Sequence, residues 1–402
     1  MKRLAFSVPG VLGPMNISRV RALGGLLVLG TAMLVAPVSF AFAQGTLSGL
    51  GFGYPVGGAS TRVAGTAGAF GEFDAVSPFN PAAVGGITRT LIAAQTEPEF
   101  RTLRLGGVKE RTTTQRVPLI MIALPTRNGV TAALSGRTFL DRSYSTRTTG
   151  TVVIGGNTLA TNDQIDVRGS IADLRAAVGW RVNSKLSIGL AGHLFTGDNL
   201  VATSRRFDDT TSFGSVLDSS RVTYFGRGVS VGGEVQIVKG LSAAASYRKG
   251  FSLDSRVSDT VRSRANVPDR VGASLRYDGV PGSIFAIGIE QQNWSRMQSL
   301  GSSSVQAHDA TNWHVGAETG GPQVLGTTVQ VRVGYARNTL PFGTNGQSVN
   351  ESRIGGGFGL PLARDFASLD FSVQRALRTM SGGGKENAWL LGLGLQIRPG
   401  GP

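Results

Sequence analysis

Cysteine is absent from this chain of 402 residues, and histidine occurs only three times. The first absence excludes disulfides, thiolate nucleophiles and thiolate metal sites. No Gly-x-Ser-x-Gly elbow and no His-Glu-x-x-His helix is expected, and the glycine runs at 355–357 and 382–384 do not begin phosphate-binding helices. The sequence therefore predicts no catalytic residues, no cofactor, no metal and no enzyme activity.

The three histidines have no evident catalytic partners. His193 is predicted to face inward, opposite an apolar outward face that includes Leu190. His308 and Asp309 are adjacent, and neighbouring residues of a strand point to opposite faces, so they do not form a dyad. A polar stretch containing Asp208-Asp209 and Asp218 could bind a divalent cation, although acids spaced this loosely are usually just solvated.

Acidic residues are scarce: 25 stand against 40 lysines and arginines, which gives a formal net charge of +15. The basic residues are scattered rather than clustered, so no nucleic-acid partner is predicted. Anionic lipopolysaccharide, or an anionic solute, is the favoured partner for this charge. Ordinary solvation of loops is the alternative.

The first 43 residues are expected to be a secretory signal peptide. Basic residues precede the apolar core, namely Lys2, Arg3, Arg19 and Arg21. The core runs from 22 to 38 and leads to Ala41-Phe42-Ala43, a cleavage pattern that makes Gln44 the first mature residue. Met15 is an alternative start, and a membrane anchor is the alternative to cleavage. No apolar run of about 18 residues follows, which argues against a helical membrane protein.

From about residue 87 to 402, apolar and polar residues alternate with a period of two. Val271, Ala273, Leu275 and Tyr277, for example, fall on one face of a predicted strand. A soluble β-sandwich alternates in the same way. The predicted strands are long, however, and their apolar faces carry no charges, which favours a transmembrane β-barrel.

Breaks in the alternation predict the number of strands. Short breaks lie at 127–129, 183–184, 238–240, 278–282, 320–326 and 363–365, and longer polar breaks lie near 102–115, 143–165, 200–218, 256–267, 297–308, 341–350 and 378–386. Short and long breaks alternate, as tight periplasmic turns and longer extracellular loops do in outer-membrane barrels. The predicted fold is all-β, a 14-stranded antiparallel transmembrane barrel in the outer membrane.

Residues 44–86 do not alternate and are rich in glycine and alanine. Side chains of the strands alone cannot fill so wide a lumen, so this segment is expected to fold inward as a hatch or plug. Within it, Asn80-Pro81 predicts a fixed corner, because proline keeps the preceding residue out of the helical region. The asparagine amide can then tie that corner to neighbouring backbone. An ordinary loop turn is the alternative.

The sequence of this segment resembles the N-terminal signature of FadL-type transporters of hydrophobic compounds. The resemblance lies in residues 60–70, with Gly68 and Phe70, and continues through Asp74 to the Asn80-Pro81-Ala82 motif. Residues 267–271 and 293–295 are also similar to the family's pattern. The resemblance implies a hatch inside a fourteen-stranded barrel that passes fatty acids or aromatic hydrocarbons and releases them sideways at a kinked strand. One departure is the C-terminus, which lacks the terminal aromatic residue common in such barrels.

Several charged or polar residues fall on predicted lumen faces: Arg270, Arg276, Arg332, Glu234, Glu290 and His193. They predict either a charged constriction that selects solutes or, as the favoured interpretation, mutual pairing across a plugged interior.

Taken together, these patterns predict a passive outer-membrane channel for small hydrophobic compounds, gated by the hatch. The alternatives are a secretion-linked or surface-attachment barrel without transport activity, and a general polar porin, because fold alone does not fix cargo. The expected partners are outer-membrane lipid and lipopolysaccharide, the hydrophobic substrate, and the barrel-assembly machinery during biogenesis.

Overall fold

The computed structural model describes residues 53–399, apart from 106–107, 115–118, 155–156, 209–213, 301–305, 325, 345–346, 364 and 380–383. These residues belong to one compact unit, Ala41–Pro402. The predicted signal peptide and the first residues of the predicted hatch, 44–52, lie outside the described residues.

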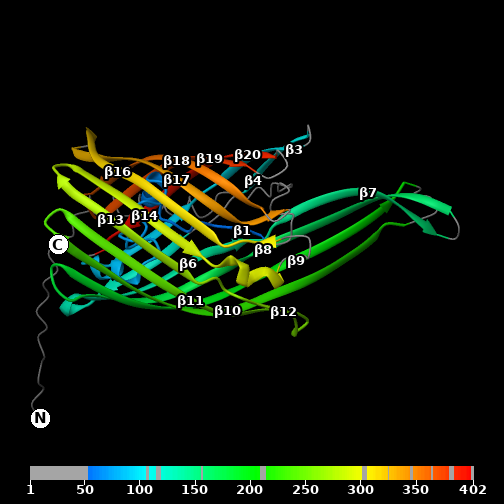
Figure 1. Cartoon of the computed structure of the whole chain (residues 1–402), viewed down its shortest axis with the longest axis horizontal. Helices are drawn as coiled ribbons and strands as arrows, with labels where there is room; N and C mark the ends of the chain where they lie inside the picture. The colour runs from blue at the N-terminus through cyan, green and yellow to red at the C-terminus, as the bar shows by residue number, and fades with distance from the viewer. Residues whose placement is uncertain are drawn as a thin grey trace, which may run out of the picture. The chain divides into compact units, whose positions relative to one another are not determined.

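The barrel wall consists of fourteen strands that pair antiparallel in chain order (Figure 1). Five of them are interrupted by a bend or insertion and carry two labels. The strands are β2 (Leu91–Thr96) with β3 (Glu99–Leu105), β4 (Val108–Thr114) with β5 (Leu119–Pro125), β6 (Val130–Asp141) with β7 (Tyr144–Ile154), β8 (Asn157–Arg181), β9 (Leu186–Phe207), β10 (Val216–Val238), β11 (Leu241–Val257), β12 (Thr260–Asn266) with β13 (Arg270–Val280), β14 (Ser283–Gln292), β15 (Gln306–Ala307) with β16 (Ala310–Val324), β17 (Thr327–Thr344), β18 (Gln347–Leu362), β19 (Ala367–Thr379) and β20 (Lys385–Ile397).

The last strand pairs with the first and closes the sheet. Ile397 of β20 lies opposite Ile92 of β2, and Leu390 lies opposite Glu99 of β3. Closure matters because the hydrocarbon of a bilayer offers no hydrogen-bond partners to an open strand edge. The fourteen-stranded antiparallel barrel predicted from the sequence is confirmed.

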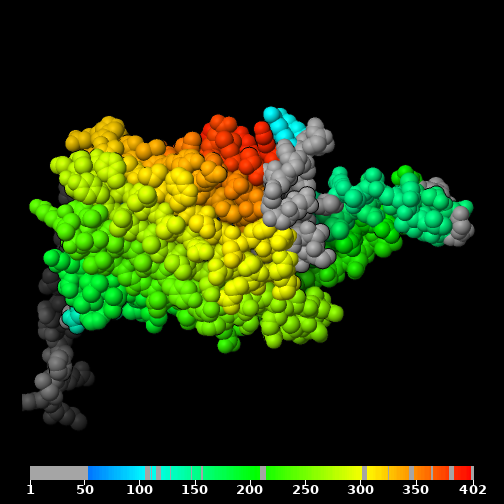
Figure 2. Space-filling model, in the orientation of Figure 1, coloured from blue at the N-terminus to red at the C-terminus, as the bar shows by residue number. Residues whose placement is uncertain are grey.

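The longer polar breaks were expected to be loops, and for most of their length this is wrong. Within 143–165, residues 144–154 form β7 and residues 157–165 begin β8, with Tyr144 opposite Val167 and Ile154 opposite Asn157. Strands β8, β9 and β10 have 25, 22 and 23 residues, about twice the ~10 that cross a bilayer. Their outer parts and β7 project beyond the wall as one sheet (Figures 1 and 2). Backbone pairing continues through polar residues because the ladder does not depend on side-chain polarity.

The two faces of each strand differ as the alternation predicted. On β13, Val271, Leu275 and Tyr277 point outward, whereas Arg270 and Ser274 are buried. Large apolar side chains cover the outside of the other wall strands in the same way. An apolar surface of this extent is unfavourable in water and matches the lipid-facing band of a membrane barrel.

Among the described residues, helical structure is limited to short elements: α3 (Thr61–Gly65), η1 (Pro81–Gly86), η2 (Arg127–Gly129) and η3 (Trp294–Leu300). In the described part of the chain, no helix is both long and apolar enough to cross a membrane. The α3 and η1 helices and the two-residue strand β1 (Tyr54–Pro55) belong to residues 53–86, called the N-terminal segment below.

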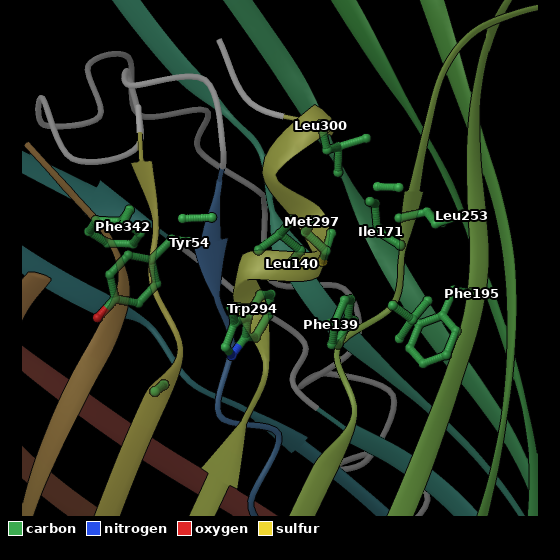
Figure 3. Close-up of a cluster of buried hydrophobic side chains, with 14 of the residues drawn as sticks. Tyr54, Phe139, Leu140, Ile171, Phe195, Leu253, Trp294, Met297, Leu300 and Phe342 are labelled. Atoms are coloured by element: carbon green, nitrogen blue, oxygen red, sulfur yellow. The ribbon is translucent and has the colours of Figure 1, made fainter. Parts of the chain in front are cut away.

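A cluster of buried apolar side chains, called the apolar cluster below, lies toward the long-hairpin end of the barrel interior (Figure 3). Trp294 and Met297 of η3 meet Phe139 of β6 there, and Phe195 of β9 lies next to Phe139. Tyr54 of the N-terminal segment packs against Phe342 of β17, with ring centroids 5.9 Å apart. Residues far apart in sequence therefore enclose one apolar region.

Candidate functional site in the barrel interior

Asn80 fixes the corner of the N-terminal segment. Its side-chain oxygen accepts a hydrogen bond from Ala82 N at 2.9 Å and caps η1, and Pro81 occupies the first helical position, where no N–H is needed. Its amide nitrogen donates to Glu72 O at 3.0 Å and to Gly233 O of β10 at 3.2 Å. One buried amide thus ties the segment both to itself and to the wall.

The corner at Asn80 packs against a row of glycines in the barrel wall. Gly179, Gly189 and Gly232 lie side by side on β8, β9 and β10, and they form what we call the η1 glycine row. A Cβ at any of these positions would overlap atoms of residues 80–85. The backbone of the segment therefore rests directly on the backbone of the wall.

The α3 helix packs against a second row of glycines in the wall. Gly316, Gly334 and Gly355 lie side by side on β16, β17 and β18, and we call them the α3 glycine row. A Cβ at Gly334 would overlap the backbone of Thr66, the residue that ends α3. In the sequence alone, inward-facing glycines suit either a wet or a plugged lumen. Their packing role depends on the strand register, which the sequence alone does not provide.

Arg270 links the segment to two wall strands. It donates to Glu72 Oε1 at 2.6 Å, to Glu290 Oε2 at 2.5 Å and to Ser246 Oγ at 2.9 Å. Its guanidinium also lies 4.6 Å from the ring centroid of Phe79. Each of the three guanidinium nitrogens of Arg270 therefore donates a hydrogen bond, as a buried charge requires.

Arg332 of β17 forms a second group of ion pairs inside the barrel. It donates to Glu318 Oε2 at 2.6 Å and to Asp370 Oδ1 at 2.5 Å. Arg62 of α3 donates to the other oxygen of Glu318 at 2.8 Å. Glu234 and Arg276 are paired only loosely, at 3.7 Å. Most of the predicted lumen charges are thus mutually paired.

Tyr54 places β1 against a buried ionic group. The guanidinium of Arg378 is fully buried and contacts the carboxylates of Glu99, Glu351 and Glu386. The Tyr54 ring lies over this guanidinium at 4.6 Å, and its hydroxyl donates to Glu351 at 3.3 Å. Burial raises the pKa of the Tyr54 hydroxyl well above its usual range, so the group stays protonated and remains a donor.

The other residues of the family-like motif are structural within the segment. Gly68 has φ +103°, a conformation that favours glycine, and it lies against His314. The Nδ1 of His314 is 2.9 Å from the carbonyl oxygen of the residue before Gly68. Phe70 is buried at 2% exposure, and Asp74 accepts two hydrogen bonds from Ser77, at 2.8 and 2.7 Å.

His193 faces the lumen and joins a chain of hydrogen bonds that the sequence did not predict. Its Nδ1 is 2.8 Å from Asp173 Oδ1, and its Nε2 is 2.9 Å from Ser230 Oγ. Ser230 is the serine of Gly-Val-Ser-Val-Gly at 228–232, which lies within strand β10 and opens no helix. Ser230 is 2% exposed, and Asp173 also accepts a hydrogen bond from Arg137, so this chain of hydrogen bonds is buried.

The side chains of His308, Asp309 and Asp208 do not form a common site in the described structure. The backbone N–H of His308 donates to Pro341 O, whereas the carboxylate of Asp309 accepts from Ser295 N. Asp208 directly follows the last residue of β9, and Asp209 lies outside the described residues. Over the described ranges, no three His, Asp or Glu side chains are grouped as a metal ion would require.

A cavity of about 160 Å³ lies between the N-terminal segment and the wall. Aromatic rings and cations both line it: Phe79, Phe139, Trp294, Arg137, Arg248 and Arg270. The Arg248 guanidinium lies 5.5 Å from the Phe139 ring centroid and 5.7 Å from that of Phe195. The cavity thus borders the apolar cluster on one side and a group of arginines on the other.

The wall changes its pairing beside this region. Among the described residues, β5 and β6 pair from Pro125 and Thr131 as far as Ile120 and Gly136. Beyond Gly136, the described residues of β6 pair with β8 on one side and, at Leu140, with β1 on the other. Outside the wall, a mainly apolar groove of about 1280 Å³ includes Ile120 and Gly136 in its lining.

Comparison with known proteins finds solved structures of similar fold. No family model and no curated protein sequence matches the chain. A solved FadL homologue from Pseudomonas aeruginosa is 13% identical, with a TM-score of 0.60 over 86% of this chain and 99% of that one. The monoaromatic hydrocarbon channel CymD is 12% identical, with a TM-score of 0.54 over 85% and 97%. The toluene transporter TodX of Pseudomonas putida is 12% identical, with a TM-score of 0.52 over 85% and 98%.

At these identities the likeness concerns the fold. The chain has the fold of FadL-type channels, so the resemblance first seen in residues 60–82 is confirmed at that level. The solved neighbours are transport channels rather than enzymes.

Proposed function

We propose that this chain is an outer-membrane channel for the passive uptake of small hydrophobic compounds, with the N-terminal segment as its hatch. The observation that carries the proposal is the cavity between that segment and the wall, which borders the apolar cluster toward the long hairpins. A hydrophobic compound can exchange one apolar surrounding for another along this path, whereas a polar solute would lose its hydration. The names of the solved neighbours, a toluene transporter and a monoaromatic hydrocarbon channel, support the same class of cargo.

The contacts of the segment support a hatch that is held in place yet removable. Hydrogen bonds and ion pairs from Asn80, Glu72 and Arg62 attach it to the wall, and the two glycine rows allow close contact without interlocking side chains. Polar bonds of this kind can be exchanged for water when the segment moves. Gating then means a shift of the segment that enlarges the cavity.

The release step that we favour is sideways through the wall. The end of the β5–β6 pairing at Gly136 leaves β1 of the segment as the strand that covers β6 there. The apolar groove outside this point would receive a hydrophobic compound directly into lipid. Movement of β1 would therefore couple opening of the hatch to opening of the wall.

The two alternatives drawn from the sequence fit less well. A general polar porin needs an open wet lumen, whereas the segment occupies much of the described interior, beside cavities of about 160 Å³ and 680 Å³. A surface-attachment barrel would use the sheet that projects from β7 to β10, and that sheet is compatible with a transport role as well.

Uptake measurements test the proposal. In liposomes containing the purified protein, toluene should equilibrate faster than in empty liposomes, while arabinose should not. A variant that lacks residues 53–86 should admit arabinose. Rapid arabinose entry through the intact protein would instead support the porin alternative, and unchanged arabinose entry in the deletion variant would contradict the hatch.

A further inference from the structure

A group of basic side chains lies exposed on the outer face of the barrel wall, on four neighbouring strands. We call it the outer basic cluster: Arg104 of β3, Lys109 and Arg111 of β4, Arg375 of β19 and Lys385 of β20. Leu103, Ala376 and Glu386 each neighbour one of these residues in sequence and are buried. Since side chains alternate between the two faces of a strand, the cluster points away from the lumen.

The strand register brings these charges side by side. Lys385 lies opposite Arg104, and Arg104 lies opposite Lys109 on its other side. Neighbouring strands are ~4.8 Å apart, and like charges directly opposite one another destabilise a sheet. Three cations in one row therefore favour an anion held against them.

Acidic partners are missing from this part of the outer face. The outward positions between the cations hold neutral residues: Thr102, Leu377 and Asn387. Over the described residues, no carboxylate forms an ion pair with any member of the cluster. Lys249 on the outer face of β11, by contrast, has Asp269 at 2.9 Å from its Nζ. The positive charge of the cluster is thus uncompensated within the described chain.

The cluster lies at the edge of the membrane, toward the end of the barrel that carries the projecting sheet (Figure 1). The 13 residues of β20 rise about 30 Å at a tilt of ~40°, whereas the apolar band of such a barrel is about 25 Å tall. Lys385 begins this strand and therefore lies above the band. Trp389 and Phe100, exposed to 44% and 43%, lie side by side below it, as aromatic rings do at a membrane interface. The cluster is thus at the level of the lipid headgroups of the outer leaflet.

We propose that the outer basic cluster binds the diphosphorylated sugar headgroup of one lipopolysaccharide molecule, the lipid A part, with its acyl chains along Trp389 and the apolar wall below. This inference takes only the outer-membrane location from the function proposed above. Each phosphate carries about −1.5 to −2 charges, so two phosphates come close to balancing the five cations. Arginine and lysine are the usual ligands of phosphate. A phospholipid with a single negative charge balances the cluster only in part, so the site discriminates between the two lipids.

Lipid binding to the folded barrel in detergent tests this proposal, with native mass spectrometry to count the bound lipids. The probes are diphosphoryl lipid A, monophosphoryl lipid A, which has one phosphate fewer on the same acyl chains, and phosphatidylglycerol. The variant Arg104→Gln with Lys385→Gln removes two charges from the cluster. The matched control is Lys185→Gln with Lys239→Gln, which removes two exposed charges from the short turns at the opposite end of the barrel.

The wild-type protein should bind one diphosphoryl lipid A about tenfold more tightly than phosphatidylglycerol, with monophosphoryl lipid A between them. The cluster variant should bind diphosphoryl lipid A about tenfold more weakly or worse, since two charge contacts to phosphate are lost, whereas the control should stay within about twofold of wild type. Binding should persist in EDTA because the cations of the protein contact the phosphates directly. If the double variant does not fold, Lys385→Gln alone serves as the measurement, with an expected loss of about fivefold.

Equal weakening in the control variant would show that net charge alone attracts the lipid, and it would overturn the site. Phosphatidylglycerol bound as tightly as diphosphoryl lipid A would overturn the match to two phosphates, and loss of binding in EDTA would overturn the direct contact. Toluene permeation through the cluster variant should equal that of wild type, because the cluster faces away from the lumen. Failure of the wild-type protein to pass toluene would count against the proposed channel function and leave the lipid measurements as a separate test.

Discussion

At the scale of the residue, Arg270 is a side chain whose loss should strongly destabilise the fold, because it pairs with two buried carboxylates. Arg270→Met leaves Glu72 and Glu290 buried without their cation, so we expect the free energy of unfolding to fall by about 3–5 kcal/mol. Glu72→Gln in the same background should recover part of that loss, because one of the stranded charges is removed. Urea titration, followed by the mobility shift between folded and unfolded barrel on gels, measures both. Strictly additive losses would show that the Arg270–Glu72 contact contributes nothing.

Asn80 permits a finer test at the same scale. Asn80→Ala removes the cap of η1 and the two donated hydrogen bonds, and we expect it to destabilise the segment by about 1–2 kcal/mol. Asn80→Asp keeps the capping acceptor but not the donors to Glu72 and Gly233, so its effect on hydrogen exchange of residues 80–86 should be smaller. Equal exchange rates in the two variants would mean that the cap is unimportant.

The sequence predicted which of these residues face inward but not whom they meet. Alternation along β13 and β14 placed Arg270 and Glu290 on the lumen side. The third partner, Glu72, is 198 positions away from Arg270 and lies in a segment without alternation. The closeness of Ser230, His193 and Asp173 likewise depends on the register of three strands. No local pattern carries that information.

At the scale of the element, the glycine rows should control how well the N-terminal segment fits. Gly334→Val and Gly189→Val each insert a branched side chain where the wall touches segment backbone, so the segment should shift and arabinose should leak. Gly192→Val is the matched control on β9, since a Cβ there meets nothing within 4 Å. Arabinose flux through liposomes containing each variant gives the result. A tight barrel for Gly334→Val and Gly189→Val would mean that the segment does not seal the lumen.

The sequence predicted the presence of the strands better than the residues at which they end. Alternation predicted the strands wherever one face meets lipid and the other the lumen. Beyond the membrane both faces of a strand meet water, so the alternation fades although the backbone ladder continues, as it does from Tyr144 to Ile154. For this reason residues 143–165 look like a loop in the sequence and form a hairpin in the structure.

At the scale of the whole molecule, the number and closure of the strands followed from the sequence, and the interior did not. Six short and seven long breaks suffice to count fourteen strands. The cavity, the apolar cluster and the end of the β5–β6 pairing at Gly136 depend on side chains from many strands at once. Such features arise only after the barrel closes.

The projecting sheet provides the last prediction, because it lies apart from every contact of the proposed channel. Shortening the β7–β8 hairpin at the Ser145–Asp166 pair and the β9–β10 hairpin at the Val201–Ser220 pair removes its outer part. The N-terminal segment, the cavity and the closure of β20 onto β2 use none of the removed residues, and a shorter loop costs less entropy to close. We therefore expect the shortened barrel to unfold at the same urea concentration and to pass toluene at the wild-type rate in liposomes. Slower toluene entry at unchanged stability would show that the sheet takes part in capturing the compound, and the channel would then begin outside the membrane.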